Sequence, residues 1–138
     1  MSLFGIFFGT GAEEKETEGA VRVLIVDDDE TTCQLLAEIL DREGMEAVWT
    51  VNSDSGYEMS LHQEYDLYIL DVVMPSLLGT EFATRLKARR RGASIILISA
   101  FADAALRQTA TGLGVTLLSK PFTPGQLLEV IAQALGGQ

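Results

Sequence analysis

The sequence is poor in the features that mark secreted, membrane-spanning and nucleic-acid-binding proteins. It has 138 residues and one cysteine, Cys33, which excludes a disulfide framework and makes a cytoplasmic location the expected one. No apolar run reaches the roughly 18 residues that a membrane helix needs, and the short segment LFGIFFG lacks the basic leader and cleavage site of a secretory signal. The net charge is −10, so the chain is repelled by nucleic-acid phosphates, and cations or basic partners are favoured instead.

What the sequence does contain is enough apolar surface for one compact domain, because 47% of its residues are hydrophobic. We predict this domain over residues 20–138 and a flexible tail over residues 1–19. The tail begins apolar and Gly-rich and continues as the charge run AEEKETEG, which favours a solvated segment. Two interpretations of the apolar part remain: a disordered tail, or a segment that docks on a partner or on the domain itself.

From residue 21 onward, apolar runs with strand character alternate with segments of helical periodicity. Strands are predicted over 21–26, 46–51, 66–70, 94–99 and 115–119. Helices are predicted over 31–44, 53–63, 80–92, 103–114 and 123–135. Continuous apolar strands are buried on both faces, so the pattern predicts an α/β fold with helices on either side of a parallel sheet. The segment 46–51 is the most mixed strand and is expected at an edge.

Local signals mark several helix ends. Thr123, Pro124 and Gln126 have the spacing of a capping box with proline at the first helical position, and Gly44 and Gly92 are expected to end the first and third helices.

Polar residues stand where these strands end, and in such sheets ligands bind at the carboxyl ends of the strands. Asp27, Asp28 and Asp29 follow the first strand, Asp71 ends the third, Ser99 ends the fourth, and Ser119 and Lys120 end the fifth. Convergence of these ends would gather at least three carboxylates around one ammonium group and one hydroxyl group.

Carboxylates about 4 Å apart repel by about 4 kcal/mol at an effective dielectric near 20, and Lys120 offsets only part of this. A hard divalent cation would offset the rest, and Mg²⁺ suits one or two carboxylates, water and a phosphate oxygen. We therefore predict a Mg²⁺ site completed by a phosphorylated species. Asp71 would be the nucleophile that forms an aspartyl-phosphate. Mg²⁺ and Lys120 would neutralise the phosphoryl oxygens, and Ser99 would hydrogen-bond one of them.

Four motifs, VLIVDDDE, YILDVVMPSLLG, ILISAF and SKPF, together resemble the receiver domain of two-component response regulators, similar to the chemotaxis response regulator fold. The resemblance covers about residues 20–136 and implies a flavodoxin-like, three-layer α/β/α fold with strand order 2-1-3-4-5. It implies phosphorelay signalling, with Asp71 accepting a phosphoryl group from a histidine kinase or a histidine phosphotransfer protein. Activity as an enzyme is not expected beyond assistance of this transfer and slow autodephosphorylation.

The resemblance also implies the individual roles at the site. Asp27 and Asp28 correspond to the acidic pair, with Mg²⁺ held mainly through Asp28, by Asp71 and by the backbone carbonyl of Val73. Ser99 corresponds to the switch hydroxyl and Lys120 to the phosphate-binding lysine. The peptide bond between Lys120 and Pro121 is expected to be cis, which X–Pro bonds adopt at modest cost.

Three residues depart from the usual pattern. Leu117 stands where receivers usually carry Tyr or Phe, and leucine can fill that position but cannot turn a hydroxyl in or out. Val73 and Phe101 lie two residues beyond Asp71 and Ser99, at positions that influence hydrolysis of the phosphoryl group in this family. Because both are apolar and could screen the attacking water, slow autodephosphorylation is predicted.

Three functions are compatible with the sequence. The first is a phosphorylation-dependent receiver that signals through its fourth helix, fifth strand and fifth helix to a protein partner or a second copy, either as a stand-alone regulator or as part of a larger protein. The second is a receiver-like binding module that phosphorylation does not switch. The third is a phosphohydrolase of the haloacid dehalogenase type, which would need an acid where this sequence has Val73.

Several other charged, aromatic and sulfur-containing residues are expected to have structural roles. The basic run RLKARRRG suits a helix C-terminus, where cations complement the dipole, better than phosphate binding. Asp29 is expected to be solvated near a helix start and His62 to be exposed. Cys33 and Trp49 are expected to pack in the core and against a neighbouring helix.

Overall fold

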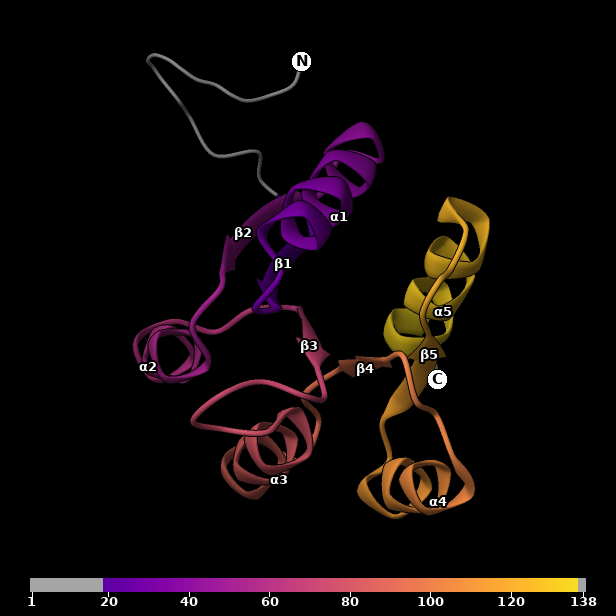
Figure 1. Cartoon of the computed structure of the whole chain (residues 1–138). Coiled ribbons are helices and arrows are strands. Elements are labelled where there is room, and N and C mark those ends of the chain that lie inside the picture. The colour runs from indigo at the N-terminus through magenta and orange to yellow at the C-terminus, as the bar shows by residue number, and fades with distance from the viewer. Residues whose placement is uncertain (1–18, 137–138) are drawn as a thin grey trace.

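The fold is built on a five-stranded parallel sheet in the order β2-β1-β3-β4-β5, as predicted (Figure 1). The computed structural model describes residues 19–136, so nearly all of the predicted tail lies outside the described residues. The strands are β1 (Arg22–Val26), β2 (Glu46–Thr50), β3 (Leu67–Asp71), β4 (Ile95–Ser99) and β5 (Thr116–Ser119). The helices are α1 (Glu30–Arg42), α2 (Ser53–His62), α3 (Gly79–Arg89), α4 (Ala104–Leu113) and α5 (Pro124–Gly136).

Helices cover both faces of the sheet and make the three predicted layers (Figure 1). Helices α1 and α5 lie on one face, and α2, α3 and α4 lie on the other. Successive side chains of a strand point to opposite faces of the sheet, so each strand contributes to both hydrophobic cores. In β1, Val23 and Ile25 belong to the cluster beneath α1 and α5, whereas Leu24 and Val26 belong to the cluster beneath α2, α3 and α4. The predicted edge strand, β2, pairs only with β1 in the sheet. Within residues 19–136 no helix combines the length and the apolar character needed to cross a bilayer.

Most of the helix ends predicted from local sequence are confirmed, and one is wrong. Gly44 follows α1 with a φ of 80°, a conformation that L-residues rarely adopt. The third helix, in contrast, ends at Arg89 and is capped by Arg90, which is extended, so Gly92 is not its stop. Arg90 makes the last helical bond, from its N–H to the carbonyl of Leu86, and its extended backbone then carries the chain out of the helix. Its side chain donates to the carbonyl of Tyr65 in the loop before β3 and anchors the chain at this point.

The packing roles expected of isolated residues are also confirmed. Cys33 is fully buried in the α1/α5 core, and Trp49 is partly buried against the same cluster. His62 is exposed at the end of α2, where its ring contacts Glu58 of the same helix.

The capping box at the start of α5 makes a specific stability prediction. The Thr123 hydroxyl accepts from the backbone N–H of Gln126, and the Gln126 side chain accepts in return from the N–H of Thr123. Thr123→Ala is therefore expected to lower the free energy of unfolding by about 1 kcal/mol, measured by urea denaturation. Thr111→Ala, at an exposed position near the end of α4, is the control, and an equal loss in both variants would contradict the role of the cap.

Candidate functional site

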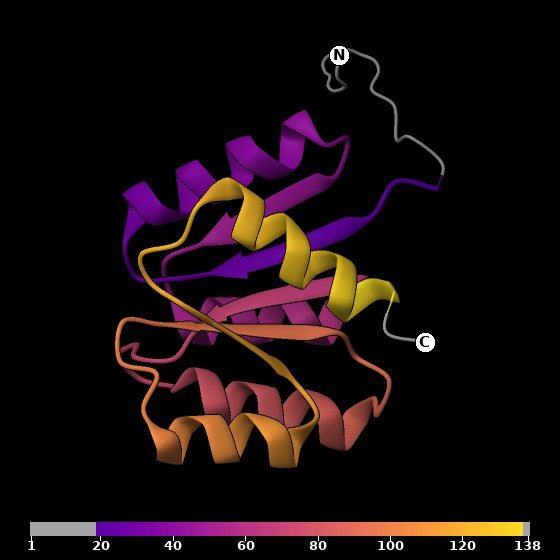
Figure 2. The same ribbon diagram turned by 90° about the vertical axis from the view of Figure 1, so that its right-hand side faces the viewer.

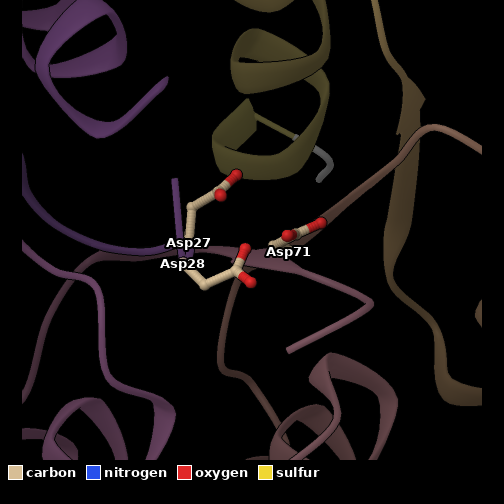
Figure 3. A group of neighbouring side chains, drawn as sticks. All are labelled: Asp27, Asp28 and Asp71. Atoms are coloured by element: carbon tan, nitrogen blue, oxygen red, sulfur yellow. The ribbon is translucent and has the colours of Figure 1, made fainter. Parts of the chain in front are cut away.

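Three carboxylates meet at the carboxyl edge of the sheet, where the ends of β1 and β3 lie side by side (Figure 3). Asp27 and Asp28 directly follow β1, and Asp71 is the last residue of β3. Each contributes one oxygen to a group in which all ligand atoms lie within 4.8 Å of one another. Asp27 and Asp71 are buried, whereas Asp28 is exposed at the mouth of the site. The predicted convergence of acidic side chains is therefore present.

Lys120 reaches this group from the loop after β5. Its Nζ lies 3.0 Å from Oδ2 of Asp27 and 3.5 Å from Oδ1 of Asp71. The loop is held beside β4 by a hydrogen bond from the N–H of Lys120 to the carbonyl of Ser99, and the following bond to Pro121 is cis. One ammonium group thus faces two buried carboxylates, and the exposed Asp28 has no ion pair among residues 19–136.

Burial and neighbouring charges shift the pKa of two residues of the site, Asp71 and Lys120. Burial, reinforced by the neighbouring charge of Asp27, raises the pKa of Asp71 from its ordinary 3.8 to about 6. Lys120 opposes this rise but does not cancel it. Burial disfavours the charge on Lys120, yet its hydrogen bond to Asp27 and the charges of Asp27 and Asp71 raise the pKa of the ammonium group above its usual value. The site therefore carries uncompensated negative charge at neutral pH.

Two residues that the sequence did not mark as site residues, Gly79 and Ser53, support Asp71. A Cβ at Gly79 would lie 2.2 Å from the backbone oxygen of Asp71, so only glycine lets the start of α3 approach the end of β3 so closely. The buried Ser53 hydroxyl donates to the carbonyl of Pro75 and accepts from the N–H of Leu77, which fixes the β3–α3 loop. The available signal for Gly79 was a glycine directly before the helix predicted over 80–92. Ser53 gave no such signal, because its partners lie more than twenty residues away in sequence.

The other predicted site residues are not members of the three-carboxylate group. Ser99 is buried at the end of β4, and its hydroxyl accepts from the N–H of Phe101. Val73 and Phe101 are 62% and 78% exposed, so they form an apolar rim on two neighbouring loops. Leu117 is partly buried on the face of the sheet that α2, α3 and α4 cover, and it fills that position as a packing side chain.

Asp29 is not part of the three-carboxylate group. It occupies the N-cap position of α1 at an exposed site, and its carboxylate accepts from the Thr32 hydroxyl at 2.6 Å rather than from a backbone N–H of the helix. This hydrogen bond lowers the pKa of Asp29. The expected structural role at the start of the helix therefore describes Asp29 better than a role as a metal ligand.

The donor set fits a small, hard cation. All three candidate ligands are carboxylates, two of them are buried, and the single ammonium group leaves negative charge uncompensated. Carboxylate oxygens are the ligands that Mg²⁺ takes in proteins, and Mg²⁺ keeps several waters, which the exposed side of Asp28 allows. Residues Asp27, Asp28 and Asp71 are thus the ones that would hold such an ion.

Comparison with known proteins places this geometry in a family. Residues 23–132 match the model described as the response regulator receiver domain. The chain is 35% identical over 107 residues to the uncharacterized transcriptional regulatory protein YbdJ of Bacillus subtilis, covering 78% of this chain and 47% of YbdJ. It is 32% identical over 120 residues to the probable chemotaxis protein CheY of Rhizobium etli, covering 84% of this chain and 93% of that protein.

A solved structure gives the same result for the fold. The CheY-like response regulator receiver domain protein from Methanospirillum hungatei superposes with a TM-score of 0.81 at 27% identity, covering 86% of this chain and 96% of that one. The chain spans about half the length of the transcriptional regulatory proteins that it matches. The match over 110 residues, the sheet order and the acidic group at the strand ends agree, and the chain therefore belongs to the receiver domain family of two-component response regulators.

Proposed function

We propose that this domain is a phosphorylation-dependent signalling receiver in which Asp71 accepts a phosphoryl group from a phosphohistidine, with Mg²⁺ at the acidic group. The donor would be a histidine kinase or a histidine phosphotransfer protein. The observation that carries the proposal is the meeting of Asp27, Asp28, Asp71 and Lys120 from three separate segments at one edge of the sheet. Membership of the receiver family supports it.

The residues divide the work of the transfer between them. An oxygen of ionised Asp71 attacks phosphorus, the phosphorus–nitrogen bond of the donor breaks, and the imidazole nitrogen keeps the electron pair and takes a proton. Lys120, already 3.5 Å from Asp71, would pair with a phosphoryl oxygen. Ser99 would donate its hydroxyl proton to another. When bound, Mg²⁺ would neutralise charge on the phosphoryl oxygens; Asp27, Asp28, Asp71 and the carbonyl of Val73 would hold it.

Labelling by a small phosphodonor tests the proposal directly. Incubation with acetyl phosphate and Mg²⁺ is expected to add one phosphoryl group per chain, seen by intact-mass spectrometry and mapped to Asp71. Asp71→Asn should abolish the label, and removal of Mg²⁺ with EDTA should suppress it. Asp41→Asn, an exposed aspartate of α1, is the matched control. Labelling that survives in Asp71→Asn, or no labelling of the wild type, would refute the proposal.

One specific observation keeps a second function open. Leu117 occupies the usual aromatic position and packs into the core face, so it supplies no hydroxyl that could follow the state of Ser99. A receiver-like module that binds partners without being switched would share this feature. Beryllofluoride with Mg²⁺ separates the two: a spectral or oligomeric response supports the switch, and unchanged amide spectra support the unswitched module.

Output is proposed to pass through α4, β5 and α5 to a downstream protein or a second copy. Apart from Glu129, helix α5 carries no charged residue, whereas Leu117 and Leu118 of β5 pack into the two cores. A helix without lysine or arginine offers nothing to the phosphates of a nucleic acid, which favours a protein partner. The phosphohydrolase alternative has no support at the site, because the position of its second acid is the exposed, apolar Val73.

The apolar rim predicts a long-lived phosphoryl group. Val73→Asn would place a polar group that can orient water beside Asp71, so we expect hydrolysis about tenfold faster, a decrease of about 1.4 kcal/mol in the barrier. The measurement is the loss of labelled protein by mass spectrometry after the donor is removed. Leu61→Asn, an equally polar change at an exposed leucine of α2, is the control. Rapid decay of the wild type that Val73→Asn leaves unchanged would contradict the prediction.

A further inference from the structure

The end of α3 concentrates positive charge in an otherwise acidic protein. Five of the ten Lys and Arg residues of the chain lie within seven positions, and we call them the α3 basic cluster. The cluster consists of Arg85, Lys87, Arg89, Arg90 and Arg91. Because helices run antiparallel to the strands they follow, this cluster lies at the amino edge of the sheet, opposite the site that contains Asp71 (Figure 2). The site chemistry described above does not use it.

Part of the cluster is not neutralised within the described part of the chain. Arg85 pairs with Glu81 at 3.0 Å, and Arg90 pairs with Glu64 at 3.4 Å. Arg89 and Arg91 are exposed and have no ion-pair partner among residues 19–136, whereas Lys87 donates only to the carbonyl of Arg91. The dipole of α3 accounts for one or two cations at its last turn, which leaves positive charge facing solvent.

The chain enters the domain at the same edge. The N–H of Arg22, the first residue of β1, donates to Asp66, and the N–H of Asp66 donates back to the carbonyl of Arg22. The preceding residue, Tyr65, has the Arg22 guanidinium 5.6 Å from its ring centroid and accepts at its carbonyl from Arg90 at 3.1 Å. Arg22 and the α3 basic cluster thus adjoin the same short segment.

The residues that precede Arg22 carry the opposite charge. Residues 13–18, EEKETE, hold four glutamates and one lysine, a net charge of −3. They lie outside the described residues and end next to Gly19. We propose that this acidic segment, residues 13–18 of the same chain, docks on the α3 basic cluster, with its glutamates paired to Arg89, Arg91 and Lys87.

The length of residues 13–18 and their covalent attachment to the domain favour this segment over a separate acidic partner. An extended chain advances about 3.3 Å per residue, so residues 13–18 span about 20 Å and reach from the start of β1 across the loop before β3 to the end of α3. Covalent attachment gives the segment an effective concentration in the millimolar range, which makes weak, exposed ion pairs sufficient. A second copy carries the same net charge of −10 and is repelled. Docking would cover the cluster and restrict its access to other anions.

Paramagnetic relaxation tests the contact in the full chain. A nitroxide attached to Thr17→Cys is selective, because Cys33 is fully buried and burial raises the pKa of its thiol to about 12. At low salt we expect the amide signals of residues 87–91 to lose intensity relative to the reduced label, because the tether holds the nitroxide at a high effective concentration beside the cluster. At about 0.5 M NaCl, where the Debye length is near 4 Å, the signals should recover.

Two variants show whether the α3 basic cluster causes the broadening of these amide signals. Arg89→Gln with Arg91→Gln should remove the broadening, whereas Arg107→Gln, an exposed cation on α4, should leave it. Broadening that is absent at low salt, or that persists in the double variant, would overturn the proposal. A mixture of isotope-labelled chain without nitroxide and unlabelled chain with it should show no broadening. Broadening there would assign the contact to a second copy instead. None of these results depends on phosphorylation.

Discussion

Asp71→Asn is expected to stabilise the metal-free protein at pH 7.5 by on the order of 2 kcal/mol. The physical reason is that Asp71 is buried beside Asp27, and Lys120 compensates only part of the charge. A neutral amide of the same shape removes the repulsion and the desolvation of the charge. The substitution therefore gains stability while it removes the nucleophile proposed for phosphoryl transfer.

The pH dependence follows from the direction of the shift. The pKa of Asp71 is about 6 in the folded protein and 3.8 ordinarily, so the folded state binds the proton more tightly than the unfolded chain does. The resulting stabilisation is fully present below about pH 4 and is lost as the pH rises through about 6. The difference in stability between Asp71→Asn and the wild type should therefore grow over this window and level off above it.

Urea denaturation in EDTA between pH 4 and 8 measures this difference. Asp41→Asn, at an exposed position, controls for the general effect of losing one charge. Saturating Mg²⁺, at about 100 times its dissociation constant, should stabilise the wild type by about 2.7 kcal/mol and Asp71→Asn by much less. Equal stability of the two proteins at pH 7.5 in EDTA would show that the charge at Asp71 is relieved in some other way.

Gly79→Ala is expected to destabilise the protein by about 3 kcal/mol and to impair the site as well. The new methyl group would meet the Asp71 carbonyl oxygen at 2.2 Å and Cα of Val72 at 2.9 Å. These are backbone atoms, so no side-chain rotation relieves the overlap. The N–H of Gly79 also donates to the carbonyl of Val72, and the methyl group would force this contact apart.

Two measurements separate the effects of Gly79→Ala. Urea denaturation reports the loss in stability, and acetyl phosphate labelling under conditions where the variant is folded reports displacement of Asp71. Gly112→Ala is the matched control, because its methyl group would enter open space within α4 and should add up to about 1 kcal/mol of stability through helix propensity. A Gly79→Ala protein as stable as the wild type would contradict the close approach of α3 to β3.

The sequence was informative wherever a local rule decides the outcome. The apolar runs that became β3 and β4 could be recognised because both faces of a central parallel strand are buried. The capping box of Thr123 and Gln126 acts over three residues, so it was equally readable. The end of α3 was misplaced at Gly92, because the helix ends where Arg90 becomes extended and is anchored to Tyr65, a residue 25 positions away.

In the candidate site, too, some features follow from local sequence and others depend on the tertiary structure. The sequence alone determined which acids stand at strand ends, since alternating strands and helices bring every carboxyl end of a parallel sheet to one edge. Only the tertiary structure decided that Lys120 pairs with Asp27 as well as Asp71, that Ser53 and Gly79 shape the loop after Asp71, and that Val73 and Phe101 stand exposed. The alternation of strands and helices fixes the edge of the sheet at which a strand-end side chain lies, but distances of a few ångströms depend on packing between segments that are remote in sequence.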